Sequence, residues 1–327
     1  MTDAPSPATE AGPAPSTSPA PGTETISYLG PAGTFTEAAL KLAPEAAGKT
    51  WKPVTNVLEA LGDVERGESV AAMIAIENSI EGGVTASQDA LANIPGLRIV
   101  GEYVVPVRFS LVVRRGRTLD DVRTIAAHPV AYGQCRNWLT ANVPGHTHVV
   151  AASNVASAHL LFDAQPLADA AIAPVTIGER LDVASLAEDI QDNDKARTRF
   201  ALVTTRTDLP PRTGDDKTSL IVELPEERPG GLMAMLEQFA TRGVNLSMIA
   251  SRPIPEAPGR YRFVVDLDGH LHDARVADAL LGLRRYSPAV TFLGSYPRAV
   301  PSRVTVDPHY SDETYEAARA WFESLER

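Results

Sequence analysis

Three consecutive residues, Thr198-Arg199-Phe200, bring a hydroxyl, a guanidinium and an aromatic ring together directly before an apolar run. A hydroxyl can donate a hydrogen bond to a leaving oxygen, a guanidinium can hold a carboxylate, and a ring can exclude water. Taken alone, however, a β-prone Thr, an exposed Arg and a core Phe explain this tripeptide more simply. It indicates an active site only if other polar segments lie beside it.

Two Gly-containing turns are candidates for such segments. The first, Gly30-Pro31-Ala32-Gly33-Thr34-Phe35, offers backbone N–H groups to an anion at a strand-to-helix turn, and it lacks the Gly-Lys-Ser/Thr of a P-loop. The second, Glu77-Asn78-Ser79 with Glu81-Gly82-Gly83, follows an apolar run at 71–76. Ligands collect at the carboxyl ends of strands in open α/β sheets. Each turn by itself is also explained as a surface turn beside a helix cap.

A third polar set lies nearer the C-terminus and consists of Gly230, Gly231, Leu232, Asn245, Leu246, Ser247, Ser251 and Arg252. A Gly-Gly helix start lets a ligand or another backbone approach closely, although a loop and a cap would use the same residues. The histidine pairs at 146/148 and 270/272 have no carboxylate or Cys at ligand spacing, so metal binding is the minority interpretation. Cys135 is interpreted as a small buried hydrophobe.

The elements that must position these residues follow an α/β pattern. Strands are expected at 25–29, 71–76, 111–113, 124–126, 170–173 and 200–205, separated by helical stretches. One helix begins near Thr34, where Glu37 completes a capping box, and another follows Asn56 and Glu59 and ends at Gly67. The pattern predicts a catalytic unit over residues 25–206.

A polar, Pro-containing linker at 207–216 separates this unit from a βαββαβ unit at 217–297. Leu232, Met235, Leu236 and Phe239 form one apolar helical face of that unit, after Pro229 at the helix start. Residues 298–327 are expected to form an extension with a helix near 313–325. Residues 1–24 hold Ala, Pro, Ser, Thr, Gly and acids with no large apolar group beyond Met1, and they predict a disordered tail.

The composition excludes several classes of protein. The 327 residues carry a formal net charge of −11, divided as −3 over 1–25, −6 over 26–216, 0 over 217–297 and −2 over 298–327, which argues against a nucleic-acid binder. A single Cys excludes a disulfide framework. No apolar run reaches 18 residues, and the first residues lack the features of a signal or transit peptide, so we expect no membrane partner and a cytoplasmic location. The acidic balance also argues, at first sight, against an anionic substrate.

The order and spacing of these motifs resemble the prephenate dehydratases from about Ile26 to Pro297. The segments that carry the resemblance are GPAGTF (30–35), IENSIEGG (76–83), AHPVAYGQC (127–135), TRF (198–200), NLSMIASRP (245–253) and GRYRFVVDLDGH (259–270). Each segment alone is weak, and their combination is specific.

The resemblance implies a two-lobed catalytic unit, folded like type II periplasmic binding proteins with the site between the lobes, followed by an ACT domain that senses phenylalanine. It implies that Thr198 is catalytic and that the Glu77-Asn78-Ser79 and His128-Pro129 segments line the cleft. From the chemistry of the residue types, Gly33, Thr34, Asn78, Ser79, Arg199 and Phe200 are the candidates for substrate binding, with Arg199 or N–H groups near Gly33 and Thr34 holding a carboxylate.

The resemblance further implies the decarboxylative dehydration of prephenate to phenylpyruvate, with no metal or organic cofactor. It implies an effector site from the third polar set, L-phenylalanine as the effector, and a homodimer or homotetramer. Aromatisation drives the reaction, so the enzyme needs to position the substrate, desolvate the carboxylate and assist hydroxyl departure. We expect Thr198 to donate a hydrogen bond to the leaving hydroxyl.

The chain departs from the family pattern at two places. Ala127-His128-Pro129-Val130 stands where the family has Ser-His-Pro-Gln, which removes two polar side chains and predicts altered affinity or a binding role for neighbours such as Gln134. Ala250 replaces the Glu of a Glu-Ser-Arg-Pro motif, and a methyl group cannot accept a hydrogen bond from an ammonium. We therefore predict weakened or altered inhibition by phenylalanine.

Three other functions remain open at this point. Arogenate dehydration uses the same chemistry on an amino rather than a keto side chain. A prephenate decarboxylase that does not aromatise the ring is disfavoured by Thr198, which would assist loss of the hydroxyl. A non-catalytic amino-acid sensor is disfavoured because it has no need of this Thr.

Overall fold

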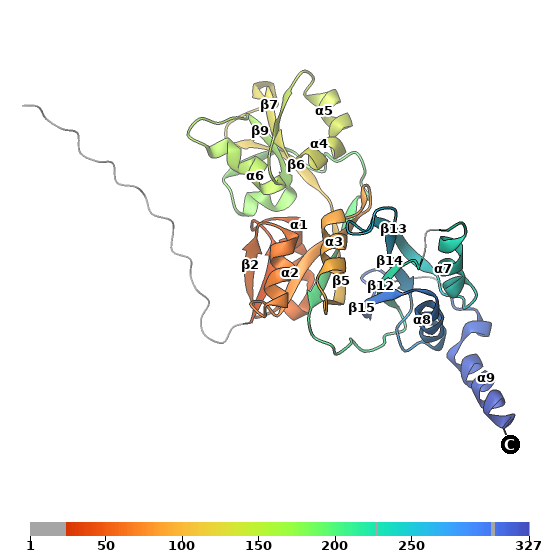
Figure 1. Cartoon of the computed structure of the whole chain (residues 1–327). Coiled ribbons are helices and arrows are strands. Elements are labelled where there is room, and N and C mark those ends of the chain that lie inside the picture. The colour runs from red at the N-terminus through yellow and green to blue at the C-terminus, as the bar shows by residue number, and fades with distance from the viewer. Residues whose placement is uncertain (1–23, 226–227, 302–304, 327) are drawn as a thin grey trace, which may run out of the picture.

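The computed structural model describes residues 24–225, 228–301 and 305–326, in two lobes and a C-terminal unit (Figure 1). The predicted tail lies outside the described residues except for Glu24. Lobe 1 is built on a sheet of order β2-β1-β3-β11-β5, with the short β4 paired to β3. Its strands are β1 (Thr25–Leu29), β2 (Thr50–Val54), β3 (Ala71–Asn78), β4 (Gly82–Gly83), β5 (Arg98–Pro106) and β11 (Arg197–Thr204).

Two sets of side chains alternate along β11 and bury the two faces of this sheet. Phe200 and Leu202 pack under α1 (Phe35–Leu42), whereas Ala201 and Val203 pack under α2 (Val57–Glu65) and α3 (Thr85–Asn93). This is the period of two that an extended strand requires. Successive residues of β11 thus face opposite sides of the sheet and two different environments.

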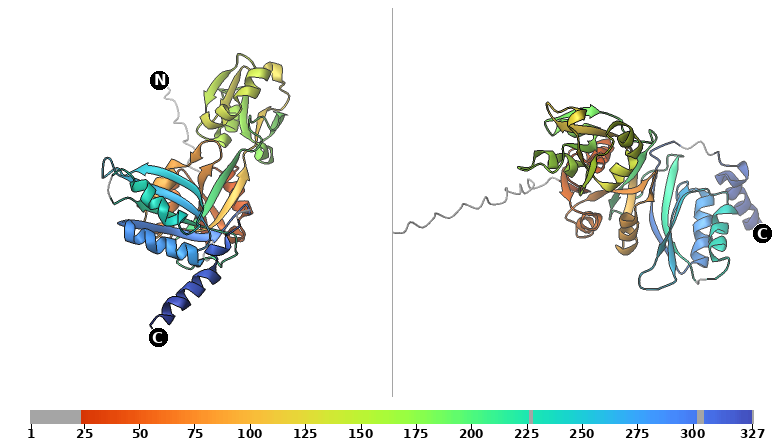
Figure 2. Two further views of the ribbon diagram at one scale, coloured as in Figure 1. Left: turned by 90° about the vertical axis from the view of Figure 1, so that its right-hand side faces the viewer. Right: turned by 90° about the horizontal axis from the view of Figure 1, so that it is seen from above.

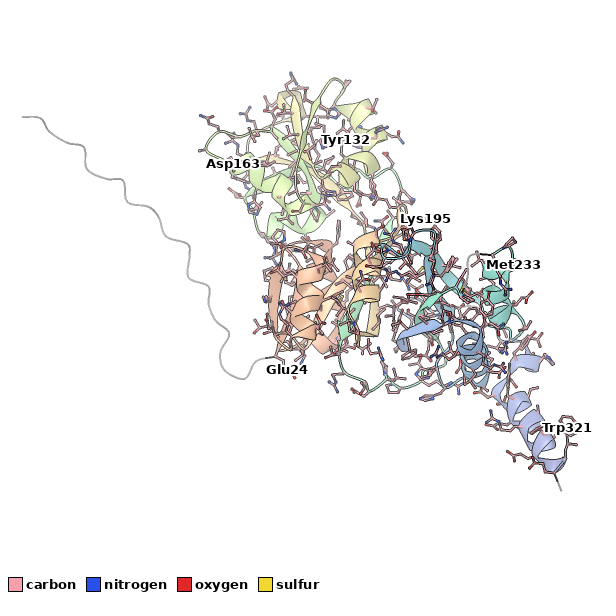
Figure 3. The ribbon with its side chains drawn as sticks, in the orientation of Figure 1. Glu24, Tyr132, Asp163, Lys195, Met233 and Trp321 are labelled. Atoms are coloured by element: carbon pink, nitrogen blue, oxygen red, sulfur yellow. The ribbon has the colours of Figure 1, made fainter. Side chains whose placement is uncertain are left out.

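Lobe 2 contains a second sheet of order β10-β6-β9-β7-β8. Its elements are β6 (Phe109–Arg114), β7 (Thr124–Ala127), α4 (Pro129–Gln134), α5 (Arg136–Asn142), β8 (Thr147–Val150), α6 (Asn154–His159), β9 (Ala170–Pro174) and β10 (Val183–Ala187). The chain passes between the lobes twice, after β5 and before β11. The two passages are joined by a hydrogen bond of 2.8 Å from Val107 N to Ala196 O. Lys195 marks this junction in Figure 3.

The C-terminal unit has the element order β12 (Asp216–Glu223), α7 (Gly231–Ala240), β13 (Leu246–Pro253), β14 (Tyr261–Asp268), α8 (Ala274–Tyr286) and β15 (Ala289–Pro297). Its sheet order is β13-β14-β12-β15, with α7 and α8 covering one face (Figure 2). The other face contributes Ile221, Val264, Leu293 and Tyr296 to a core shared with lobe 1. At Gly294 an added Cβ would stand 2.2 Å from Ile99 O, so this glycine permits β15 to approach β5.

Most expected elements are confirmed, including the βαββαβ order, whereas β2, β4, β5, β8 and β10 are not among the expected strands. Thr198 lies inside β11 rather than before it, because β11 begins at Arg197. Asp216, assigned to the linker, is the first residue of β12. The helix α9 (Asp312–Ser324) projects from the body of the chain, with Trp321 near its end (Figure 3). Among the described residues, no helix is long and apolar enough to cross a membrane.

Candidate active site

A β-bulge brings Thr198 and Asn78 to the same face of the lobe 1 sheet. Thr198 pairs with Asn78 and Arg199 with Glu77, but Phe200 pairs with Ala75, so β3 carries one extra residue at this point. The extra residue reverses the alternation of β3, and Asn78 faces the same side as Ala75. A regular strand would instead have presented Glu77 to that side.

The hydroxyl of Thr198 is oriented by Asn78. The amide nitrogen of Asn78 donates to Thr198 Oγ1 at 3.2 Å, and Asn78 Oδ1 accepts from the N–H groups of Ile80 at 2.8 Å and Glu81 at 3.3 Å. The turn after β3 therefore fixes the amide so that its nitrogen is the side that meets Thr198. Because Thr198 Oγ1 accepts this bond, its own proton is available to a ligand.

Thr198 and Asn78 line a cavity of about 260 Å³ between the two lobes. Phe35 and Phe109 meet across it edge to face, with ring centroids 5.6 Å apart. The lining residues are Leu29, Gly30, Thr34, Phe35, Thr36, Ala75, Asn78, Val107, Phe109, His128, Val130, Gln134, Ala152, Ser153, Asn154, Thr198 and Phe200. None of these described lining residues is Asp, Glu, Lys or Arg. The cavity is thus a neutral space edged by hydroxyl, amide and aromatic groups.

Two amide side chains of lobe 2, the buried Gln134 and the half-buried Asn154, line this cavity with buried polar atoms that have no partner among the described residues. Both amide atoms of Gln134 and the Oδ1 atom of Asn154 are in this state. Buried polar groups are normally hydrogen-bonded, and leaving them unpaired is costly. This pattern suits a site completed by a polar ligand.

The N-terminus of α1 contributes from lobe 1. Thr34 caps this helix by accepting from Glu37 N at 3.4 Å and donates to Leu29 O at 3.2 Å, leaving the first N–H groups of the helix toward the cavity. The N–H of Gly33 is already taken, because it donates to Glu37 Oε2 at 2.7 Å. Arg180 of lobe 2 binds both oxygens of Glu37 at 2.7 Å, so one ion pair joins the lobes beside the cavity.

His128 caps α4 at the far wall of the cavity. Its Nδ1 accepts from Val130 N at 3.3 Å, which leaves Nε2 as the protonated nitrogen of the neutral ring. Burial lowers the pKa of His128, and the nearby carboxylate of Glu81 opposes this only in part. The ring is therefore neutral at pH 7 and can donate a hydrogen bond through Nε2.

Comparison with known proteins decides the family. A model of the family described as prephenate dehydratase matches residues 26–208. The prephenate dehydratase of Corynebacterium glutamicum is 40% identical over 304 residues, covering 90% of this chain and 96% of the relative, and that of Amycolatopsis methanolica is 40% identical over 303 residues, covering 92% and 98%. The chain belongs to the prephenate dehydratase family.

A solved structure agrees with this assignment. Prephenate dehydratase from Arthrobacter aurescens in complex with L-Phe is 50% identical, with a TM-score of 0.88 over 92% of this chain and 99% of that one. The chain therefore shares the fold of that structure, a two-lobed binding-protein-like unit with a further C-terminal unit.

Several residues predicted to bind substrate lie elsewhere in this dehydratase. Arg199 points away from the cavity and makes ion pairs on the opposite face of the sheet, so it is not the group that holds a carboxylate there. Ser79 exchanges hydrogen bonds with the backbone of Arg197, and Glu77 faces Arg199. The N–H of Gly33 is occupied by Glu37. Strand alternation and the bulge, neither visible in the motif itself, separate Arg199 and Glu77 from Asn78, Thr198 and Phe200.

Sequence reasoning named Gln134 only as a substitute and missed Asn154, Ser153, Phe35 and Phe109. The Ser153-Asn154 start of α6 carried a helix-cap signal that could have found two of them, since Ser153 Oγ accepts from Ala156 N at 3.0 Å.

Cys135 is fully buried as expected, and burial raises the pKa of its thiol to about 12. His146 and His148 both contact Tyr132. The hydroxyl of Tyr132 is hydrogen-bonded to His146 Nε2, and its ring stacks on the His148 ring with centroids 3.9 Å apart.

The predicted effector residues fall at two ends of the C-terminal unit. Gly230, Gly231 and Leu232 start α7 near the end of β13 that carries Ser251 and Arg252, whereas Asn245, Leu246 and Ser247 lie at the opposite end, where Leu246 pairs with Leu267. Arg252 is directed to lobe 1, and its guanidinium binds both oxygens of Asp89, at 3.0 and 2.8 Å. The two groups of residues do not form one pocket within a single chain.

Proposed function

We propose that this family member converts prephenate to phenylpyruvate, CO2 and water in the interlobe cavity, with Thr198 as the catalytic residue. The observation that carries the proposal is the Thr198 hydroxyl, which accepts a hydrogen bond from Asn78 and so has its proton free toward a small, neutral, partly aromatic cavity. Thr34, Asn78 and Phe200 line the same cavity.

The reaction needs little covalent chemistry from the protein. The bond between the ring and its carboxylate breaks, its electron pair becomes a ring π bond, and the hydroxyl on the opposite ring carbon leaves with its own bonding pair. Thr198 stabilises the departing hydroxide by hydrogen bonding. The hydroxide takes a proton that comes ultimately from solvent and becomes water. Moving a carboxylate out of water into a neutral cavity favours its loss as CO2.

Neutral donors replace a guanidinium in holding the two carboxylates of prephenate. The unpartnered amide nitrogen of Gln134 is one such donor, and the residues at the start of α1 and His128, whose Nε2 carries the proton, line the same cavity. Such donors bind an anion without a counter-charge that would stabilise the ground-state carboxylate as an ion pair. The acidic net charge of the chain does not oppose this, because exposed charges beyond a Debye length are screened.

Prephenate is favoured over arogenate by the same neutrality. Arogenate carries an ammonium where prephenate carries a keto oxygen, and a buried ammonium calls for a carboxylate partner. Among the described residues that line the cavity there is no Asp or Glu side chain. We therefore expect turnover of prephenate to exceed that of arogenate.

The test is a direct assay of the full-length chain. Purified protein is incubated with prephenate or with arogenate, and the products phenylpyruvate and phenylalanine are quantified by alkaline absorbance and by amino-acid chromatography. Phenylpyruvate from prephenate supports the proposal. Absence of phenylpyruvate, or faster conversion of arogenate, contradicts it.

We further propose that the C-terminal unit is an ACT-type regulatory domain that binds L-phenylalanine between two copies of the chain. The relative from Arthrobacter aurescens was solved with L-Phe, and the two groups of candidate effector residues lie at opposite ends of β13. A second chain placed beside the first would bring opposite ends together, which supports an even-numbered homo-oligomer. The cytoplasmic location stays a prediction.

Ala250 leads us to expect weak inhibition. It stands on β13 opposite Val264 and offers a methyl group where the family has a carboxylate. Titration calorimetry with L-phenylalanine should give weaker binding to the natural chain than to the Ala250→Glu variant, with the inhibition of phenylpyruvate formation changing in parallel. Tight binding by the natural chain, unchanged in Ala250→Glu, would sink this expectation.

A further inference from the structure

The sheet face opposite the cavity holds a buried ion cluster centred on Arg199. Arg199 Nη1 donates to Glu102 Oε2 at 3.0 Å, its Nε lies 3.0 Å from Glu77 Oε2, and its Nη2 binds Asp266. Glu77 and Glu102 belong to lobe 1, in β3 and β5, whereas Asp266 belongs to β14 of the C-terminal unit. The guanidinium of Arg199, on β11, therefore ties β3 and β5 of lobe 1 to β14 of the C-terminal unit.

Three members of the cluster are buried, whereas Glu77 is half-buried at its edge. The side chains of Arg199, Glu102 and Asp266 are exposed by only 8%, 2% and 3%. Lys217 Nζ also donates to Glu102 Oε2 at 3.0 Å, and Ser219 Oγ donates to Asp266 Oδ1 at 2.5 Å. Removing one partner from such a cluster leaves another charge buried without compensation, so the arrangement resists small displacements.

The charge state of the cluster follows from its members. Burial alone would lower the pKa of Arg199, but the carboxylates of Asp266 and Glu102, together with Tyr296, raise it well above its ordinary value. Burial lowers the pKa of Lys217, and the positive charge of Arg199 lowers it further. Arg199 is thus the fixed cation around which the carboxylates are arranged.

The position of the cluster in the register gives it a catalytic consequence. Arg199 is bonded directly to Thr198, and Glu77 directly to Asn78, so the pair that faces the cluster is next to the pair that faces the cavity. A rotation of either strand that moved Arg199 relative to Asp266 would also change the distance between Thr198 Oγ1 and the Asn78 amide.

We propose that Asp266, a residue of the C-terminal unit, is a positioning residue of the active site, because it holds Arg199 and through Arg199 the Thr198–Asn78 pair. This inference rests on the proposed function of Thr198. It assigns to docking of the C-terminal unit a direct effect on catalytic geometry, beyond adding stability to lobe 1.

The same interface offers a matched control. Arg252 in β13 and Asp89 in α3 also form a two-bond ion pair between the C-terminal unit and lobe 1, but α3 carries no residue that lines the cavity. Asp89→Asn removes one carboxylate from the interface as Asp266→Asn does. Asp89 is 38% exposed and Asp266 only 3%, so a stabilising role alone predicts a larger loss of stability in Asp266→Asn. It also predicts a kcat within twofold of the natural chain in both folded variants.

The experiment compares steady-state kinetics of the full-length chain and its two variants. Asp266→Asn should lower kcat for prephenate about tenfold with KM changed less than twofold, which is the split expected when a transition-state interaction is misplaced. Asp89→Asn should keep kcat within twofold. Equal losses in both variants, or kcat within twofold of the natural chain in Asp266→Asn, would overturn the proposal. If Asp266→Asn fails to fold, Asp266→Glu takes its place, with the same outcomes.

A second readout separates this inference from the proposed activity. With threonine methyl groups labelled for NMR, the Thr198 signal is identified by its loss in Thr198→Ser. Asp266→Asn should shift this signal and Asp89→Asn should leave it in place, whether or not the chain turns over prephenate. An unmoved Thr198 signal in a folded Asp266→Asn variant would contradict the inference, whereas a natural chain inactive on prephenate would contradict only the proposed function.

Discussion

The two faces of the lobe 1 sheet at β3 and β11 differ in their chemistry within one residue step. On the cavity face, Thr198 and Asn78 meet a neutral space lined by hydroxyl, amide and aromatic groups. On the other face, Arg199 and Glu77 join a dense ion cluster with the C-terminal unit. Within the Thr-Arg-Phe motif, the guanidinium thus fixes the scaffold, and we propose that the hydroxyl serves the reaction.

The largest effect should come from removing the hydroxyl of the cavity face. Thr198→Ala should lower kcat for prephenate by about 100-fold, roughly 2.7 kcal/mol, as the loss of one preorganised donor typically does. Thr198→Ser keeps the hydroxyl and should stay within about tenfold of the natural chain. Near-normal turnover by a folded Thr198→Ala variant would end the assignment of Thr198.

The next effect tests the neutrality of the cavity. Gln134→Glu places a carboxylate beside a dianionic substrate and should raise KM for prephenate by at least about tenfold at pH 8, because an uncompensated like charge is costly in a partly buried site. Gln134→Leu removes the same hydrogen bonds without adding charge and serves as the control, with a smaller rise of about threefold to tenfold. Equal KM values for the two variants would show that charge in the cavity is unimportant.

A smaller effect concerns the link between the lobes. Glu37→Gln removes the charge that binds Arg180 but keeps an oxygen for the N–H of Gly33. KM for prephenate should rise about twofold to fivefold, because the contact between the lobes beside the cavity loses one partly buried ion pair. Lys41→Met, which removes the exposed pair of Lys41 with Glu179 at 3.9 Å, should change nothing measurable. A similar KM in the natural chain, Glu37→Gln and Lys41→Met would contradict a role for Glu37 in holding the two lobes together.

The smallest effect is a pH dependence of stability at His128. Its pKa in the fold lies below the value of 6.5 that an exposed histidine has, so the unfolded chain binds the proton first as pH falls. The contribution of neutral His128 to the free energy of unfolding is fully present above about pH 6.5 and is lost as pH falls through the pKa of the folded state. Urea unfolding at pH 7.5 and 5.5 should show a smaller pH-dependent loss in His128→Asn than in the natural chain. An identical loss in both would refute this contribution.

The sequence predicted the α/β organisation, the βαββαβ unit and the role of Thr34 as a helix cap, because these depend on local periodicity and capping. It did not predict the direction of Arg199. That direction depends on strand alternation and on one β-bulge opposite Phe200, which no local pattern in Glu77-Asn78-Ser79 reveals. The contribution of Asn154 was hidden for a similar reason, since it depends on how lobe 2 faces lobe 1.

The acidic composition also misled until the cavity was located. The net charge of −11 is spread over the chain and its ends, and none of the described residues lining the cavity is ionised at pH 7. Local geometry therefore decides whether a dianion binds. The basic side chains Arg197, Arg199, Lys217 and Arg298 instead border a separate pocket of about 300 Å³ on the opposite face of the sheet, with Glu77 and Glu102.

A crystal structure of the slow Thr198→Ala variant with prephenate bound tests the account most directly. We predict that the substrate lies in the interlobe cavity, with its ring hydroxyl toward residue 198 and its carboxylates at the amide nitrogen of Gln134 and the start of α1. Prephenate bound in the charged pocket on the opposite face, with the interlobe cavity holding only solvent, would contradict the account.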